Sequence, residues 1–252
     1  MADRTIVCDL DGVLYVGNQP VPGSGEALIR LERSGARVVF CTNNSFRRRG
    51  DVAAKIRSLV GYPAAEDQVF TSAMAGARMA GLSRGAFVVG GPGIVEALDE
   101  ASIPVVGDRL GCDTVMVGLD LDLSYDKLTE ATMAVRQGAR LIATNHDATF
   151  PSPEGLKPGA GAIAAAIELA SGVEAEVAGK PHAAMRELLV DAVGAGEVWM
   201  VGDRADTDLA MARAAGWLGA LVQTGVPREG LDVPDLDVAD LAAFADVLTQ
   251  RR

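Results

Sequence analysis

Two carboxylates, Asp9 and Asp11, stand two residues apart near the start of the chain, directly after the apolar run of residues 5–8. An apolar run of this kind predicts a buried strand, and open α/β sheets bind their ligands where the parallel strands end. Such a pair can hold a cation or act on a substrate. It can equally cap the turn before Gly12, and for a bare Asp-x-Asp pattern that structural interpretation is the favoured one.

Three further stretches favour chemistry over turn capping. Residues 42–45 offer a hydroxyl and amides just before a predicted helix, an arrangement suited to holding a phosphate group. Lys180, within Gly179-Lys180-Pro181, places a point charge before another helix, where it can meet an anion. Residues 202–208 follow the apolar run 198–201 and add carboxylates at a strand tip. The order of these stretches and their places at strand ends are hard to reconcile with a purely structural role.

Short β-branched runs alternate with longer stretches of helical spacing along the whole chain. This alternation is typical of strands joined by helical crossovers, so we expect an α/β fold with a parallel sheet. The predicted strands are residues 4–9, 37–42, 86–89, 114–118, 141–144, 197–201 and 219–222. The predicted helices are residues 24–34, 48–60, 72–80, 93–101, 125–137, 159–171, 182–193 and 206–215.

The overall charge disfavours two classes of partner. The 252 residues carry 23 Lys and Arg against 34 Asp and Glu, which gives a net charge of −11. A strongly acidic surface repels nucleic-acid phosphates and anionic lipids, so we expect neither nucleic acid nor membrane as a partner. The first ten residues resemble neither a signal peptide nor a membrane span, which predicts a cytoplasmic protein. The three cysteines, Cys8, Cys41 and Cys112, are predicted to be buried thiols.

The four stretches resemble, in order, the four motifs of the haloacid-dehalogenase-like (HAD) hydrolase superfamily. The resemblance covers nearly the whole chain and is greatest to the phosphatase branch with a large α/β cap, which includes nitrophenylphosphatase, phosphoglycolate phosphatase and a ribonucleotide phosphatase. The segments that carry it are DLDGVLY (9–15), TNNS (42–45), TNHDATFP (144–151), PGAGAI (158–163), GKP (179–181) and GDRADTD (202–208). The resemblance implies a Rossmann-like parallel-sheet core, residues 1–81 and 178–252, with an inserted α/β cap domain, residues 82–177.

The resemblance also implies a phosphatase mechanism that passes through an aspartyl-phosphate. Asp9 resembles the nucleophile of the first motif, and Asp11 resembles the general acid and base. An acid role requires Asp11 to be protonated when substrate binds, which the negative charges of Asp9 and of the phosphate favour. Lys180 is expected to stabilise Asp9 and the transferred phosphoryl group, and Thr42 and Asn43 to donate hydrogen bonds to the phosphoryl oxygens.

The implied cofactor is Mg²⁺, which prefers hard oxygen ligands and keeps several waters. Asp9, the main-chain carbonyl of Asp11 and Asp203 match that ligand set, while Asp208 is expected to hold the waters of the metal. In the cap, residues 145–147 are expected to contact the leaving group, because the corresponding loop of this branch faces the phosphate site. The cap residues in question are Asn145, His146 and Asp147. A purely structural turn is the alternative for them.

Two other classes of function compete with a phosphatase. A dehalogenase of this family lacks the second aspartate of the first motif, and a phosphomutase usually carries its cap earlier, so Asp11 and the late cap argue against both. A non-catalytic phosphate-binding module would be expected to have lost motif residues, and this chain has kept them.

The substrate is expected to be a small phosphate monoester. The predicted cap holds only Phe87, Tyr125 and Phe150 as aromatic residues, too few for an evident base-stacking platform. A small polyol or acid phosphate, such as glycerol 3-phosphate or 2-phosphoglycolate, is therefore favoured. A nucleoside monophosphate, a sugar phosphate and pyridoxal phosphate remain alternatives. Related capped phosphatases often pair through their caps, which makes a homodimer a candidate assembly.

Overall fold

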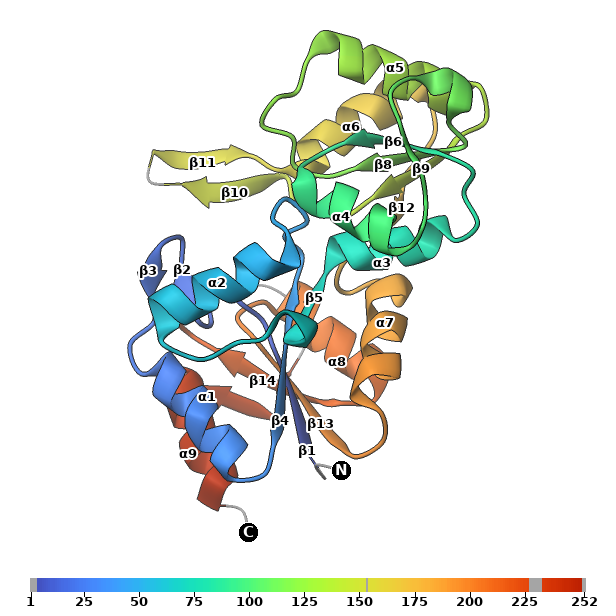
Figure 1. Ribbon diagram of the computed structural model, residues 1–252. Coiled ribbons are helices and arrows are strands. Elements are labelled where there is room, and N and C mark those ends of the chain that lie inside the picture. The colour runs from blue at the N-terminus through green and yellow to red at the C-terminus, as the bar shows by residue number, and fades with distance from the viewer. Residues whose placement is uncertain (1–3, 153, 227–232, 251–252) are drawn as a thin grey trace. The chain divides into compact units, whose positions relative to one another are not determined.

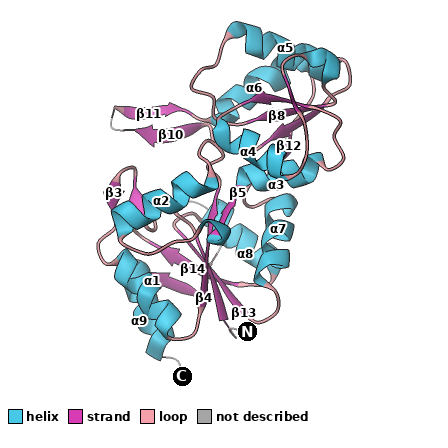
Figure 2. Cartoon of the chain, in the orientation of Figure 1, coloured by secondary structure: helices cyan, strands magenta, loops and turns pink. Residues whose placement is uncertain are grey.

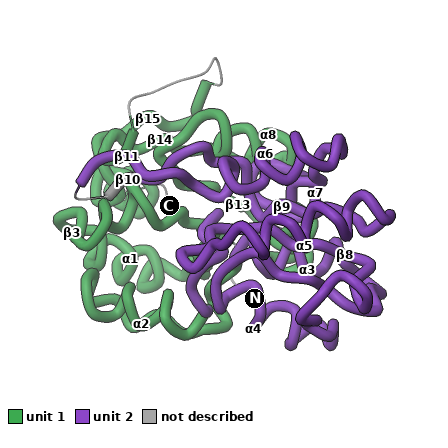
Figure 3. Tube along the Cα trace, turned by 90° about the horizontal axis from the view of Figure 1, so that it is seen from above, with its two compact units in different colours: residues 1–42, 49–70, 186–252 green, residues 43–48, 71–185 purple. Residues whose placement is uncertain are grey.

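The computed structural model describes residues 4–152, 154–226 and 233–250 of the chain. It forms two compact units, coloured separately in Figure 3. Unit 1 comprises residues 1–42, 49–70 and 186–252, and unit 2 comprises residues 43–48 and 71–185. Unit 2 contains the whole segment 82–177 together with shorter flanking pieces. The limits of a catalytic core and a cap as functional domains stay a prediction.

Unit 1 is built on a six-stranded sheet with the order β15-β14-β13-β1-β4-β5. The strands are β1 (Arg4–Cys8), β4 (Arg37–Thr42), β5 (Val69–Thr71), β13 (Glu197–Gly202), β14 (Leu218–Val222) and β15 (Leu236–Val238). β1 runs parallel to both β4 and β13, with Cys8 opposite Phe40 and Val201. Because parallel strands in this register end at one edge of the sheet, the residues that follow β1, β4 and β13 emerge side by side.

Helices cover both faces of the unit 1 sheet, as Figure 1 shows. They are α1 (Ser24–Arg33), α2 (Arg49–Val60), α8 (Ala210–Ala215), α9 (Leu241–Gln250) and most of α7 (Ala183–Val193). Side chains of α1, α2 and α9, such as Leu28, Ile56 and Phe244, form one core with Ile6 and Cys8 of β1. A strand between two helical layers is buried on both sides, and this explains why β1 reads as a continuous apolar run.

The thiols of unit 1 lie inside this sheet. Cys8 and Cys41 are fully buried and form no disulfide with each other, and they lie one residue before Asp9 and Thr42 respectively. The prediction of buried thiols is confirmed for these two residues. The third thiol, Cys112 of unit 2, is only partly buried.

Unit 2 has its own five-stranded sheet, with the order β12-β9-β8-β6-β7 and parallel pairing throughout. The strands are β6 (Ala86–Val89), β7 (Val105–Val106), β8 (Thr114–Val117), β9 (Arg140–Ala143) and β12 (Glu176–Val177). Helices α5 (Tyr125–Arg136) and α6 (Ala160–Ser171) pack together on one face, and α3 (Ser72–Ala80) and α4 (Pro92–Glu100) on the other. Figure 2 shows the resulting alternation of strands and helices.

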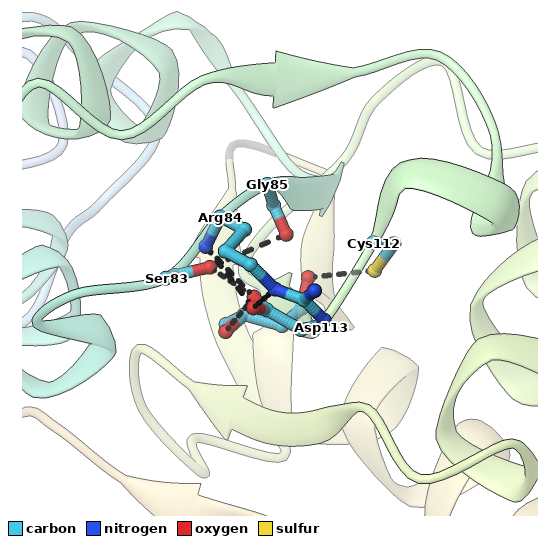
Figure 4. A network of polar contacts seen from close by, with 6 residues as sticks. Ser83, Arg84, Gly85, Cys112 and Asp113 are labelled. Carbon is cyan, nitrogen blue, oxygen red and sulfur yellow. Dashed lines mark hydrogen bonds and ion pairs between the residues drawn. The ribbon is translucent and has the colours of Figure 1, made fainter.

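A polar network holds the two loops that lead into β6 and β8 (Figure 4). The carboxylate of Asp113 accepts hydrogen bonds from the Ser83 hydroxyl, from the main-chain N–H of Arg84 and from Arg84 Nε. The hydrogen bond from Ser83, together with those from Arg84, holds the pKa of Asp113 well below its usual range. The charged form of Asp113 therefore stabilises the beginning of the unit 2 sheet.

Several elements differ from the sequence-based expectation. Residues 206–215 were expected to form one α-helix, but residues Ala205–Leu209 form a π-helical turn before α8. An antiparallel hairpin of β10 (Thr149–Ser152) and β11 (Gly155–Pro158) extends from unit 2 and was not expected. The short strands β2 (Tyr15–Val16), β3 (Gln19–Pro20), β5, β7, β12 and β15 and helix α9 were also not expected. Among the residues described, no helix is both long and apolar enough to cross a membrane.

Candidate active site

Three buried carboxylates meet at the edge of the unit 1 sheet where β1 and β13 end. Asp9, Asp203 and Asp208 each bring an oxygen atom to within 4.8 Å of the others. Their exposed fractions are 8%, 5% and 0%. Buried carboxylates at this spacing repel one another unless a positive charge offsets them. An all-oxygen set of this kind fits a hard divalent cation such as Mg²⁺, so these residues suit the metal that the sequence implied.

The carboxylate of Asp203 is held by residues that follow β14. The main-chain N–H of Val226 donates to Asp203 Oδ2 at 2.9 Å. Asp203 also lies against two glycines: a Cβ added at Gly12 would be 2.4 Å from Oδ2, and one at Gly225 would be 1.9 Å away. The Thr224 hydroxyl donates to the Gly12 carbonyl at 2.5 Å. The segment after β14 thus contacts both the first motif, at Gly12, and the last motif, at Asp203.

Sequence reasoning missed this segment. Its signal was the short Thr-Gly-Val stretch, residues 224–226, after the last predicted strand. A cavity of about 390 Å³ adjoins the same carboxylate, and its lining residues are Asp203, Leu221, Val222, Gln223, Gly225, Val226 and Asp237. Space is therefore present beside one of the three carboxylates.

Asp208 is positioned by the π-helical turn. The wide turn returns the Asp208 side chain towards its own beginning, where Oδ2 accepts the main-chain N–H of Arg204 at 3.2 Å. A Cβ at Gly202 would lie 2.1 Å from the same oxygen, so only glycine admits the carboxylate there. π-helical turns inside helices are frequent at functional sites. Arg204 also forms a bidentate ion pair with Asp206, and this pair lowers the pKa of Asp206.

Asp11 stands outside the three-carboxylate cluster and is exposed. Its loop is fixed by the main chain of Tyr15, which forms an isolated β-bridge with Asp11. The carbonyl of Tyr15 accepts a hydrogen bond from the main-chain N–H of Gly12 at 2.8 Å. The ring of Tyr15 is buried beneath the Lys55 ammonium, whose nitrogen lies 3.6 Å from the ring centroid. A cation over an aromatic face is attractive. An exposed carboxyl on an anchored loop can meet a substrate from solvent.

Two predicted phosphate ligands lie on either side of the boundary between the units. Thr42 ends β4 in unit 1 and is buried, and Asn43 begins the first segment of unit 2. The side chain of Asn43 contacts the main chain of Lys180: its Oδ1 accepts the Lys180 N–H at 2.7 Å, and its Nδ2 donates to the Lys180 carbonyl at 3.2 Å. Lys180 itself is buried, with 4% of its surface exposed.

The candidate cap residues form a turn that is tied to the same place in unit 2. Asn145 is buried, and its Nδ2 donates to the Asn43 carbonyl at 2.8 Å. Its Oδ1 accepts the main-chain N–H of Asp147 at 3.0 Å, which closes the turn. His146 points its Nε2 to Glu168 at 3.2 Å. Asn145 therefore has a clear structural role, while contact of these three residues with a leaving group stays a prediction.

The structure brings together Asp9, Asp203 and Asp208 within unit 1, and Asn43, Lys180 and Asn145 within unit 2. Action of the two groups on one phosphoryl group stays a prediction from the resemblance.

Comparison with known proteins gives a consistent result. Residues 6–104 match the family described as haloacid dehalogenase-like hydrolase, and residues 177–244 match a family described as HAD-hydrolase-like. A 5'-nucleotidase of Bacillus subtilis, YutF, is 34% identical over 91% of this chain and 90% of its own length. An acid sugar phosphatase of Staphylococcus epidermidis is 33% identical over 97% of this chain and 95% of its own. The crystal structure of a glycerol phosphate phosphatase of Mycobacterium tuberculosis in complex with magnesium superposes with a TM-score of 0.89. That structure is 32% identical, and the match covers 96% of this chain and 76% of that one.

Proposed function

Because the chain belongs to the haloacid dehalogenase-like hydrolases, we propose that it is a Mg²⁺-dependent phosphatase of small phosphate monoesters. It is a phosphoric monoester hydrolase of their phosphatase branch, and we propose that it acts through an aspartyl-phosphate on Asp9. The observation that carries the proposal is the buried cluster of Asp9, Asp203 and Asp208. Membership of a family of phosphatases removes the non-catalytic alternative. Pairing of two copies through the cap stays a prediction.

The metal would be held by Asp9, the main-chain carbonyl of Asp11 and Asp203. Asp208 would hold the waters of the metal. When bound, Mg²⁺ supplies positive charge that offsets the charge of the phosphoryl oxygens and of the carboxylates. The residues of the chain perform the remaining steps. A carboxylate oxygen of Asp9 attacks phosphorus, the bond from phosphorus to the ester oxygen breaks, and the carboxylic acid of Asp11 gives its proton to the departing alkoxide.

The second half of the reaction reverses the role of Asp11. As a carboxylate, Asp11 takes a proton from water while the water oxygen attacks phosphorus, and the bond to Asp9 breaks to release inorganic phosphate. The ammonium of Lys180 and donors at Thr42 and Asn43 stabilise the phosphoryl oxygens in both steps. The side-chain amide of Asn43 is engaged with Lys180, so we assign phosphate donation to the main-chain N–H of Asn43.

A small polyol or acid phosphate is the favoured substrate class. Of the three aromatic residues of the predicted cap, Phe87 is buried in the core of unit 2, Tyr125 is exposed at the start of α5, and Phe150 is half-buried in β10. The support for stacking on a nucleobase is accordingly weak. Similarity to a glycerol phosphate phosphatase agrees with a polyol phosphate, whereas similarity to a 5'-nucleotidase and to an acid sugar phosphatase keeps nucleotides and sugar phosphates as alternatives.

The test compares wild type with Asp9→Asn. Asn is nearly isosteric with Asp but cannot form an acyl phosphate, so we expect a normal unfolding transition and loss of essentially all turnover of nitrophenyl phosphate. Wild-type activity should also require added Mg²⁺. Substantial turnover by Asp9→Asn would overturn the covalent mechanism, and full activity after chelation would overturn the metal requirement. A panel of glycerol 3-phosphate, 2-phosphoglycolate, nucleoside monophosphates, sugar phosphates and pyridoxal phosphate then ranks the substrates by kcat/KM.

A further inference from the structure

The Asn43 side chain makes a two-point contact with Lys180, a residue 137 positions further along the chain. One planar amide accepts the N–H of Lys180 at 2.7 Å and donates to its carbonyl at 3.2 Å. Both main-chain polar groups of Lys180 are thus bonded to the same rigid group. Two hydrogen bonds from one plane fix the direction of a peptide as well as its position.

Asn43 is itself held by its surroundings in unit 2. Its main-chain carbonyl accepts hydrogen bonds from the Ser72 hydroxyl at 2.7 Å and from Asn145 Nδ2 at 2.8 Å. Its amide oxygen lies so close to Gly179 that a Cβ there would be only 2.5 Å away. Every partner of this amide is therefore a fixed part of the protein, and the second, third and cap motifs of the sequence converge on one residue.

Lys180 needs such support because of its own chemistry. A lysine has a flexible four-carbon stem with many rotamers, and its ammonium acts as a point charge. A point charge stabilises a transition state only when it is held close to its ideal place, within about 0.5 Å for designed sites. The lysine side chain is buried, so its path is set by packing and by the main chain from which it starts.

We propose that Asn43 is a positioning residue for Lys180: its side chain fixes the main chain from which the ammonium extends, and does not itself bind phosphate. This inference rests on the proposed function, in which Lys180 acts on the phosphoryl group. The rival explanation is that the amide only stabilises the fold. A purely structural role would lower the unfolding temperature without a specific dependence on Lys180.

A double-mutant cycle separates the two explanations. It uses wild type, Asn43→Ala, Lys180→Ala and the double variant, and measures the binding of inorganic phosphate in Mg²⁺ by calorimetry. For wild type and both single variants, kcat and KM for nitrophenyl phosphate are also measured. Misplacement of a catalytic group by about 1 Å can cost about a hundredfold, so we expect Asn43→Ala to lower phosphate affinity and kcat by about ten- to a hundredfold. In the Lys180→Ala background the same change should cost less than about twofold.

The matched control is Gln68→Ala. The Gln68 side-chain amide also makes a two-point contact with the main chain but lies outside the motifs: its Oε1 accepts the Ala65 N–H at 2.8 Å, and its Nε2 donates to the Val38 carbonyl at 3.0 Å. This variant should bind phosphate within about twofold of wild type. If Asn43→Ala does not fold, Asn43→Ser replaces it, because one hydroxyl cannot reach both main-chain groups of Lys180.

The outcomes are distinct. Losses that add up in the double variant would overturn the positioning role, and so would failure of both Asn43 variants to fold, since Asn43 would then be a residue of the fold alone. Normal phosphate binding and turnover by Lys180→Ala would instead refute the role that the proposed function gives to Lys180. That result is visible in the single variant, before the cycle is complete.

Discussion

Substituting Gly225 by alanine tests whether the segment after β14 holds Asp203 in place. The added Cβ would lie 1.9 Å from Asp203 Oδ2 and 2.5 Å from its Cγ. An ordinary contact begins at 3.4 Å, so the two atoms must separate by 3.4 − 1.9 = 1.5 Å. Gly225 is exposed and its φ is not in the left-handed region, so its main chain can accept alanine. Rotation of the Asp203 carboxylate relieves the contact with Oδ2, but the added Cβ would also lie 2.7 Å from Asp203 Cβ, so the segment after β14 must shift as well.

A displacement of that size is large for a metal ligand, because metal–ligand distances are defined to about 0.2 Å. Gly12 crowds the same oxygen from another direction and limits the escape of the carboxylate. Loss of supporting contacts around metal ligands typically costs about 10- to 100-fold in affinity, and we expect a loss of this size for Mg²⁺. The free energy of unfolding without metal should fall by about 1–3 kcal/mol, the usual cost of overpacking, because Asp203 is buried although Gly225 is exposed.

The assay is calorimetric titration of Mg²⁺ into wild type and Gly225→Ala without substrate, together with urea unfolding in a chelator. Gly107→Ala is the control, since an added Cβ there meets nothing within 4 Å and its φ is also not in the left-handed region. Unchanged Mg²⁺ affinity in Gly225→Ala would refute the reasoning that this segment positions Asp203. A loss of stability well above about 3 kcal/mol would show that the substitution disrupts more of unit 1 than this segment.

Three further predictions concern single side chains. Asp11→Asn should slow alkyl phosphates at least about tenfold more than nitrophenyl phosphate, whose leaving oxygen needs little protonation; kcat/KM on both esters measures this. His146→Ala and Asp147→Ala should each change the ranking of the ester panel by kcat/KM without changing the Mg²⁺ titration, because the metal ligands lie elsewhere. Asp113→Asn should lower the free energy of unfolding by about 1–2 kcal/mol at pH 7 through weakened hydrogen bonds. Because folding lowers the pKa of Asp113, its charge stabilises the folded protein above the unfolded-state pKa of about 3.9, and this contribution is lost progressively as pH falls below that value. The difference in unfolding free energy between wild type and Asp113→Asn, measured in urea, should therefore be smaller at pH 3 than at pH 7.

Each of these has an outcome that contradicts it. Equal losses of Asp11→Asn on both esters would limit Asp11 to holding the metal or its loop. An unchanged ranking for both cap variants would move substrate selection to other residues of the cap. A stability difference for Asp113→Asn that is as large at pH 3 as at pH 7 would mean that the Asp113 charge is not what stabilises the loops.

The strands that carry the chemistry were predictable because their physics is local. Residues 5–8 and 38–42 are β-branched or apolar throughout, and β1 and β4 formed there. The turn residues that follow them then had to emerge at one sheet edge. Helix α9 was not expected, although Leu241, Phe244 and Leu248 follow helical spacing and make it predictable in the same way.

Other features depend on contacts between distant residues or on exceptions to local rules. The sequence does not indicate the hairpin of β10 and β11. Pro151 is unfavourable within a strand, and the exposed residues of β11 show no alternation of apolar and polar positions. The π-helical turn needs the Asp208 carboxylate to return to Arg204, which helical spacing does not reveal. The contact of Asn43 with Lys180 spans 137 residues, so only the folded chain discloses it.

The two buried cysteines of unit 1 can report how often the strands that carry them open locally. Cys8 and Cys41 each precede a motif residue by one position, on neighbouring strands in the middle of the unit 1 sheet. A thiol reagent can reach them only when those strands separate, so their labelling rate is the rate of an exposed thiol multiplied by the equilibrium constant for opening, when closing is fast. Cys112, which is partly exposed, labels without such opening, although burial raises the pKa of its thiol and slows it at neutral pH. The stability of the strands that present Asp9 and Thr42 can thus be followed by chemical modification in the native protein, without denaturant.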